Sequence, residues 1–312
     1  MKIGYWALLS GACLGVVTGC GDAEGASGVE DVSSVEQGLA ACPAGASCVT
    51  KTLGNITVRY YTCGWSGSGQ RNSATCTVDS DFVLVGGGAE IKDNGEPGAL
   101  LTASYPEGDS WIARSKDHIR AYPHQTRAYA IGLRLAGLNK ANLQKSVKTV
   151  LKAVGPTAHP SATIVAPAGE LILSGGAYAL FGGAGQLLTK STTNGTSWSG
   201  ASKDHVRSDP GYLNVYMTTI LANPINSSLH LATDYTTSSS ISSGGGYRSV
   251  TSISVDSSLV TGIGATDSNG NRLLTDAFPL SSASGGGTVT TKDHEVAASG
   301  SAQLTLVRLR EL

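Results

Sequence analysis

The residues in this sequence whose types and spacing best suit chemistry form a Lys-Asp-His tripeptide that occurs three times. The copies are Lys116-Asp117-His118, Lys203-Asp204-His205 and Lys292-Asp293-His294. An Asp beside a His can bind a cation, bind a sugar hydroxyl or orient a proton transfer. The competing interpretation is a turn, in which the Asp accepts backbone N–H groups while the His and Lys point to water. Neighbouring residues on a strand face opposite sides, so a cooperating Asp-His pair requires a bend in the backbone.

Two tryptophans precede the first two tripeptides at a constant distance. Trp111 lies six residues before Asp117 and Trp198 lies six residues before Asp204, whereas Gly287 holds that place in the third copy. An indole face can act as a platform for a sugar ring, but a tryptophan at a repeated strand position more often belongs to the core. If the tryptophans line a ligand site, that site is present at most twice.

These residues belong to an internal repeat of about 88 residues. Ala89, Ala177 and Ala265 follow Gly-rich segments and are each 88 residues apart, and each is followed by a Leu-Leu-Thr segment and then by the tripeptide. Several anchors in constant order at a fixed period indicate tandem repeats. We place the repeats at residues 42–137, 138–225 and 226–312. Because the connections between them are short, we expect the repeats to pack with approximate three-fold symmetry, as in a prism or a compact array, rather than as three separate beads.

Composition predicts an all-β exported protein. The 312 residues include 41 glycines, only 14 % are charged, and the net charge is −1. No basic stripe is present to neutralise a phosphate backbone, so we expect no nucleic-acid partner. In the first repeat, β-branched and aromatic runs separated by turn residues predict six strands: 56–61, 73–78, 82–85, 100–105, 111–115 and 127–135. Residues 143–153 resemble a helix in composition, but their place in the repeat predicts a strand.

The N-terminus carries a targeting signal. Lys2 precedes an apolar run over 3–17 that is too short to span a membrane as a helix. The run ends in Val17-Thr18-Gly19-Cys20, which resembles a bacterial lipobox. That resemblance implies a signal peptide over 1–19, a lipid on Cys20 that anchors the protein to the membrane, and a flexible tether over 20–41. Gly21 favours the outer membrane or cell surface of the bacterial envelope. The alternative is an ordinary cleaved signal peptide.

Four cysteines remain after Cys13 and Cys20 are set aside: Cys42, Cys48, Cys63 and Cys76. An even number of cysteines in an exported protein indicates two disulfides, for which three connectivities exist. We favour Cys42–Cys48 and Cys63–Cys76 because each pair is local. A zinc site is the weaker alternative, since no C-x2-C pair occurs.

A succession of short motifs resembles small, poorly characterised secreted bacterial modules that run CPAG, GGG, SYP, W and YA in that order. The matching segments are Cys42-Pro43-Ala44-Gly45, Gly86-Gly87-Gly88, Ser104-Tyr105-Pro106, Trp111 and Tyr129-Ala130. The final cysteine that often follows the YA pair is replaced here by Gly132. The resemblance implies a surface-associated β module and brings no activity or catalytic residue with it.

The leading functional hypothesis is a surface-anchored binding module for carbohydrate or adhesion, with a polysaccharide as partner. Repeated anchors favour a multivalent binder over an enzyme, and neither G-x-S-x-G nor H-E-x-x-H occurs. A hydrolase that uses an Asp-His site and a structural envelope lipoprotein without a ligand are the alternatives. We expect no cofactor and no metal, because Asp267-Ser268-Asn269-Gly270-Asn271 lacks the final Glu of a calcium loop and is better explained as a turn.

Overall fold

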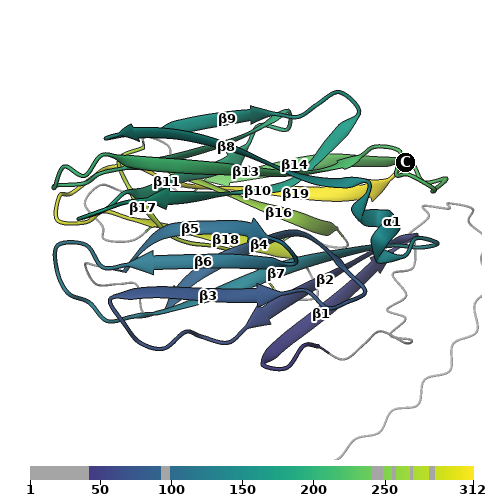
Figure 1. Cartoon of the computed structure of the whole chain (residues 1–312), viewed down its shortest axis with the longest axis horizontal. Helices are drawn as coiled ribbons and strands as arrows, with labels where there is room; N and C mark the ends of the chain where they lie inside the picture. Colours follow the sequence, from purple (N-terminus) through teal and green to yellow (C-terminus); the bar gives the residue numbers. More distant parts are fainter. Residues whose placement is uncertain (1–41, 93–98, 240–248, 255–257, 268–269, 281–284) are drawn as a thin grey trace, which may run out of the picture. The chain divides into compact units, whose positions relative to one another are not determined.

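The computed structural model describes residues 42–92, 99–239, 249–254, 258–267, 270–280 and 285–312, so the signal peptide, Cys20 and the tether lie outside the described residues. Contacts divide the chain into residues 1–31 and 32–312, and the second unit contains every described element. That unit is nearly all β (Figure 1), as the sequence predicts. Its elements are β1 (Ala46–Leu53), β2 (Ile56–Cys63), β3 (Arg71–Thr77), β4 (Val83–Lys92), β5 (Leu100–Glu107), β6 (Ser110–Lys116), β7 (Gln125–Leu135), α1 (Lys140–Gln144), β8 (Val147–Thr157), β9 (Ser161–Val165), β10 (Glu170–Leu180), β11 (Leu187–Thr193), β12 (Ser197–Lys203), β13 (Gly211–Leu221), β14 (Leu231–Ser239), β15 (Ser249–Ser254), β16 (Leu259–Asp267), β17 (Leu273–Pro279), β18 (Gly286–Lys292) and β19 (Ala302–Glu311).

The six strands expected in the first repeat are present as β2 to β7, and six strands follow in each later repeat. The strand expected over 143–153 begins only at Val147. Residues 143 and 144 instead end α1, where Asn139 caps the helix and Leu143 is buried against the core. At this junction the local capping by Asn139 favours a helix, and it outweighs the strand expected from the position within the repeat. Among the described residues, no helix is long and apolar enough to cross a membrane.

The three sheets are each assembled from two different repeats. Strands of the first repeat, β2, β7 and β4, continue into β17, β18 and β15 of the third repeat, with β1 added at the outer edge. In the same way β3, β6 and β5 of the first repeat join β10, β13 and β8 of the second. The last sheet runs β14, β19, β16, β11, β12, β9 and so joins the third repeat to the second. Each repeat thus places three of its six repeated strands in a sheet shared with one neighbour and the other three in a sheet shared with the other neighbour. The three repeats are therefore joined in a closed cycle.

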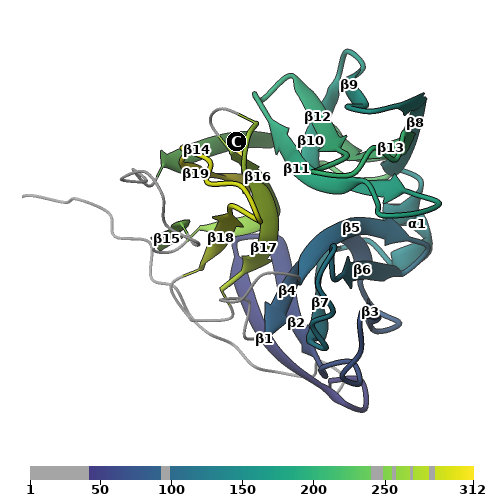
Figure 2. The ribbon, with the colours of Figure 1, turned by 90° about the vertical axis from the view of Figure 1, so that its left-hand side faces the viewer.

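The seams between repeats are short and equivalent. β5 meets β10 where Ala177 pairs with Ser104, β11 meets β16 where Ser191 pairs with Ala265, and β17 meets β4 where Ala277 pairs with Ala89. Figure 2 shows the third of these seams, where yellow β17 lies beside blue β4. The alanines that mark the sequence period therefore lie at the seams between repeats. A single repeat cannot complete its own sheets, which excludes three separate beads.

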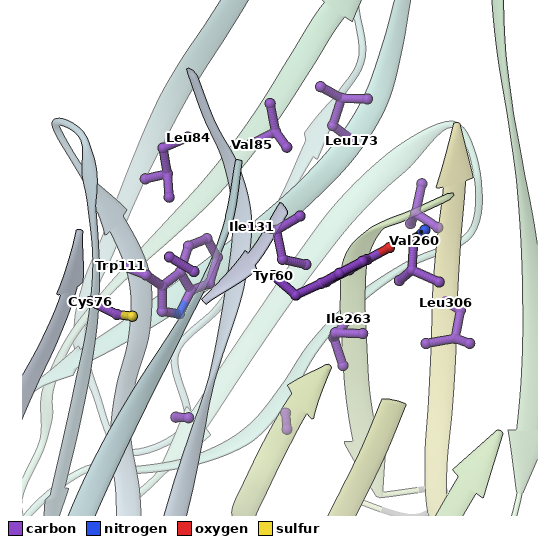
Figure 3. Packing of buried hydrophobic residues seen from close by; sticks show 14 of the residues in the cluster. Tyr60, Cys76, Leu84, Val85, Trp111, Ile131, Leu173, Val260, Ile263 and Leu306 are labelled. Atoms are coloured by element: carbon purple, nitrogen blue, oxygen red, sulfur yellow. Dashed lines mark hydrogen bonds between the residues drawn. The ribbon is translucent and has the colours of Figure 1, made fainter. Parts of the chain in front are cut away.

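One core cluster runs through all three sheets. Tyr60 of β2 is fully buried, and its hydroxyl accepts a hydrogen bond from the backbone N–H of Val260 at 2.9 Å (Figure 3). Val260 borders a β-bulge in β16, and similar bulges occur in β4 and β10. Burial raises the pKa of Tyr60 far above its ordinary value, so its hydroxyl stays protonated.

The three bulges contact one another in a ring. Ser174 Oγ in β10 donates to the backbone oxygen of Val85 in β4, and Thr261 Oγ1 in β16 donates to the backbone oxygen of Leu173 at 3.0 Å. The third contact has no room for a side chain, because an added Cβ at Gly86 would lie 2.0 Å from the oxygen of Thr261. The bulges thus bring the three repeats together at one place in the core.

Both expected disulfides are present. Cys42 is bonded to Cys48 and Cys63 is bonded to Cys76, with Cα–Cα distances of 5.9 Å and 5.5 Å. The first bond fixes the start of β1, a strand that the sequence did not predict, and the second joins β2 to β3. Such bonds persist in an oxidising compartment, which fits export of the protein.

Candidate functional site

The three histidines of the repeated tripeptides come together although they are almost 90 residues apart in the chain. Ring centroids of His118 and His205 are 5.8 Å apart, those of His118 and His294 are 5.1 Å apart, and those of His205 and His294 are 5.5 Å apart. His118 and His294 are both only 1 % exposed. We call these three residues the axial histidines, since each repeat contributes one of them to a triangle.

Two of the axial histidines bind the backbone of the next repeat. Nε2 of His118 lies 2.5 Å from the backbone oxygen of His205, and Nε2 of His205 contacts the backbone oxygen of His294. Nδ1 of His118 lies 2.9 Å from the backbone oxygen of Ala184, so both ring nitrogens contact backbone oxygens of the second repeat. Both ring nitrogens of His294 are buried without a hydrogen-bond partner among the described residues.

Burial sets the charge of two axial histidines. Desolvation lowers the pKa of His205 and is the main cause of a fall in the pKa of His294 to about 3, to which the neighbouring His118, His205 and Lys292 also contribute. The backbone of His118 opposes that fall only weakly. His294 is therefore neutral at physiological pH, and its protonation requires strong acid.

Two of the tripeptide lysines also hold the next repeat. Nζ of Lys116 contacts the backbone oxygens of Gly183 and Ala184, which lie in the loop between β10 and β11. Nζ of Lys203 lies 3.2 Å from the oxygen of Gly270 and 2.5 Å from that of Asn271, in the corresponding loop of the third repeat. Lys292 is 1 % exposed, and the loop that corresponds to it, 93–98, lies outside the described residues.

The aspartates form the turns expected of them. Oδ2 of Asp117 accepts the backbone N–H of Tyr122, Oδ2 of Asp204 accepts that of Asp209, and Oδ2 of Asp293 accepts that of Ala298, each five residues further along the chain. The backbone does bend after each histidine, where Ile119, Val206 and Glu295 have φ angles of 64°, 62° and 58°. None of these aspartates is hydrogen-bonded to its neighbouring histidine within the described part of the chain.

The tripeptides are therefore structural joints between repeats. The expected turn is present, but the part of that interpretation in which His and Lys point to water is wrong. The polar atoms of these residues hold the adjacent repeat in the first two tripeptides, and Lys292 and His294 are buried in the third. The described residues also contain no group of three His, Cys, Asp or Glu side chains placed to hold a metal ion.

The two repeated tryptophans are core residues, which overturns their use as sugar platforms. Trp111 is 2 % exposed and Trp198 is fully buried. Their Nε1 atoms donate to Ser104 Oγ at 2.9 Å and to Ser191 Oγ at 3.1 Å. Each indole packs against a glycine of the Gly-rich segment, and neither tryptophan is available to a ligand.

Partly exposed aromatic rings occur instead on the face of the β3-β6-β5-β10-β13-β8 sheet that points away from the core. Tyr105 of β5 stacks on Tyr178 of β10 at 5.2 Å and on Tyr216 of β13 at 4.9 Å between ring centroids. Tyr105 is buried between the other two rings, which are half-exposed. We call Tyr105, Tyr178 and Tyr216 the tyrosine patch. It spans a seam between repeats, so neither repeat forms it alone.

Polar groups surround the tyrosine patch. Arg114 of β6 donates from Nη1 to the Tyr178 hydroxyl at 2.6 Å, with its guanidinium carbon 4.8 Å from the centre of that ring. Its Nε atom is buried without a hydrogen-bond partner among the described residues. Asn214 pairs across the strands with Tyr178, and Tyr212, 51 % exposed, lies further along the same face of β13. Burial raises the pKa of Tyr105 and of Tyr216, so both hydroxyls remain neutral donors at physiological pH.

The same positions in the other two sheets carry different side chains. In the sheet with β4, Phe278 stacks on Tyr129 at 5.0 Å, while Glu90 takes the place of Tyr178 and is bound by Arg127 at 2.6 Å. Arg127 also lies 4.0 Å from the centre of the half-exposed Trp65 ring. In the third sheet the corresponding residues are Thr192, Thr266 and Thr305. The outer faces therefore present two aromatic clusters and one threonine cluster.

The tyrosine patch was not predicted from the sequence, although its residues occupy positions that correspond between the repeats. Tyr105 lies five residues after the first leucine of its Leu-Leu-Thr segment, where Phe278 and Thr192 are found in the other copies. The sequence signal that could have indicated the patch is an aromatic residue at a position that differs between the repeats. Positions in the core tend to carry similar residues in every repeat. Comparison with known proteins finds no protein-family model that matches this chain and no curated protein with significant sequence similarity to it.

Proposed function

We propose that this protein binds carbohydrate through the tyrosine patch. The observation that carries the proposal is the stack of three tyrosines with its two outer rings half-exposed. Tyrosine rings present an apolar face to the C–H groups of a sugar and a hydroxyl to its polar groups. Arg114 and Asn214 supply further hydrogen-bonding groups beside the rings. The stack through Tyr105 and the contact from Arg114 fix Tyr178 before a ligand arrives, which lowers the entropy lost on binding.

Two sites on one rigid body favour a polymeric ligand. The cluster of Trp65, Tyr129 and Phe278 offers a second aromatic surface on another sheet, although Tyr129 is only 5 % exposed there. When two weak sites engage the same chain, the overall affinity exceeds that of either site. A polysaccharide therefore fits the proposal better than a free monosaccharide.

The hydrolase hypothesis finds less support in the site. Its candidate Asp-His residues are engaged in turns and in contacts between repeats, and two of the three axial histidines, His118 and His294, are buried from any substrate. A structural envelope lipoprotein without a ligand remains the competing proposal. It predicts that the half-exposed tyrosines have no effect outside folding.

The test is polysaccharide binding by the purified full chain on a glycan array, followed by affinity measurements with the best ligand. We expect Tyr178→Ala and Tyr216→Ala each to weaken binding about tenfold, which corresponds to about 1.4 kcal/mol. Tyr235→Ala is the matched control, since Tyr235 is 51 % exposed on β14 of another sheet. Unchanged thermal melting of the variants separates lost binding from lost folding. Equal weakening by the control, or no glycan bound by the wild type, would refute the proposal.

We also propose that the protein is attached to the bacterial envelope, at the outer membrane or cell surface, through a lipid on Cys20. The support is the lipobox-like Val17-Thr18-Gly19-Cys20 segment together with the two disulfides of an oxidising compartment. Metabolic labelling with a palmitate analogue should mark the wild type and not Cys20→Ala. Label retained in that variant would contradict the anchor.

A further inference from the structure

The second repeat contains a long strand that is paired on one side only. β8 hydrogen-bonds to β13 and ends its sheet, and no strand of the described residues pairs with its other side. Nine of its 11 residues are exposed and the other two are half-buried. Val150 and Leu151 are 38 % and 55 % exposed, so apolar side chains face water on both sides of the strand. An exposed apolar edge of this length is a template for strand addition.

The chain itself shows how such an edge is covered. β2 holds the place of β8 in the first repeat, and β1 pairs with it over eight residues, from Ala46 opposite Cys63 to Leu53 opposite Ile56. The first six residues of β2 are buried as a result. In the third repeat β14 is also an edge, but its exposed Tyr235 packs over the turn at Gly195. β8 alone combines this position with two adjacent exposed aliphatic side chains.

Lysines at an edge strand usually oppose the addition of another strand. β8 carries Lys148 and Lys152, but each is held by its own chain. Nζ of Lys148 lies 2.7 Å from Oε1 of Glu170, and Nζ of Lys152 lies 3.2 Å from the backbone oxygen of Thr163. Both head groups are therefore engaged by other strands of the same chain.

We propose that two copies of this chain pair through β8, antiparallel, with Leu151 opposite Leu151 of the second copy. A two-fold axis between antiparallel strands must pass through a pair of identical residues, which leaves few registers. A register centred on Val150 places Lys148 opposite Lys152 of the second copy, and like charges directly opposite are destabilising. A register centred on Thr149 pairs only the first five residues of β8.

The register centred on Leu151 avoids both defects. It places Lys148 opposite Val154, Val150 opposite Lys152 and Thr149 opposite Ala153. It uses residues 147–155 and ends before Pro156, which has no N–H to donate. Leu151 also pairs with Tyr216 within its own sheet. The dimer therefore places the two tyrosine patches on the same face of one continuous sheet, although the pairing itself does not depend on carbohydrate binding.

The test is register-specific crosslinking in the full chain with Cys13→Ala and Cys20→Ala, because the other four cysteines are in disulfides. Directly opposite residues have Cα atoms about 4.5–5.5 Å apart, which permits a disulfide. Leu151→Cys should therefore give a covalent dimer on mild oxidation. Thr149→Cys is the matched control on the same face, and it lies about 13 Å from its own symmetry mate in this register.

Light scattering completes the test without any cysteine. The wild type should have the mass of a dimer, and Leu151→Lys should have the mass of a monomer with unchanged thermal melting. A monomeric wild type at the highest soluble concentration would overturn the proposal. Equal crosslinking of Leu151→Cys and Thr149→Cys would overturn it as well, since random collision makes no distinction between the two positions.

Discussion

Replacing Gly86 with alanine should lower the free energy of unfolding by more than about 3 kcal/mol, as measured by denaturant titration. The added Cβ would lie 2.0 Å from the backbone oxygen of Thr261 and 3.3 Å from Cβ of Ser174. A flexible side chain could move aside, but the oxygen belongs to the bulge of β16, and the bulges of three repeats are in contact. Relief of the clash therefore requires the repeats to separate where they join.

The matched control is Gly67→Ala, because no atom lies within 4 Å of a Cβ added at Gly67. We expect that change to stay within about 0.5 kcal/mol of the wild type. A Gly86→Ala variant as stable as the control would contradict this prediction, because it would show that the three bulges can move apart to admit a methyl group at little cost in stability.

The strands were predictable, but their pairing was not. Periodic anchors and β-branched runs identify the six strands of each repeat, since both are properties of local sequence. Which strand lies beside which depends on contacts such as Ala89 with Ala277, 188 residues further along the chain. Exchange of strands between repeats leaves no trace in a sequence in which every repeat contains the same six strands.

The position of the tryptophans, by contrast, could have been read from the sequence. A Cβ added at Gly87 would lie 2.4 Å from the Trp111 ring, and one at Gly175 would lie 2.5 Å from the Trp198 ring. The third repeat replaces the tryptophan with Gly287 and the glycine with Ile263, and an added Cβ at Gly287 would lie 2.9 Å from the Ile263 side chain. A large residue and a small one have exchanged places. Such compensation indicates contact in the core rather than a surface platform.

One feature of the tripeptides could likewise be predicted from the sequence, and another could not. A turn at the aspartates follows from local hydrogen bonding within five residues, and it was available from the sequence. The triangle of axial histidines is not local, since the rings of His118 and His205 bind the backbone of another repeat and all three rings come from different repeats. Only closure of the three repeats into a cycle brings those groups together.

The burial of histidines where the three repeats meet should make the stability of the protein depend on pH. The pKa of His294 falls to about 3 in the folded protein, against an ordinary value of 6.5 in the unfolded chain. Between these values the unfolded state binds more protons, so the free energy of unfolding decreases as the pH falls from about 6.5 to about 3. Lowered pKa values at His205 and His124 act in the same direction. We expect a loss of roughly 3–5 kcal/mol across this window, measured as denaturation midpoints at several pH values.

A substitution at His294 assigns this loss to the axial histidines. His294→Leu removes the titrating group together with two buried nitrogens that have no hydrogen-bond partner in the part of the chain that the structure describes. The variant should keep the stability of the wild type near pH 7 and lose less of it on acidification, because no proton need enter the triangle at that position. His230→Gln, at an exposed histidine outside the triangle, is the control substitution. If His294→Leu loses stability as steeply as the wild type, the acid sensitivity arises from groups other than His294.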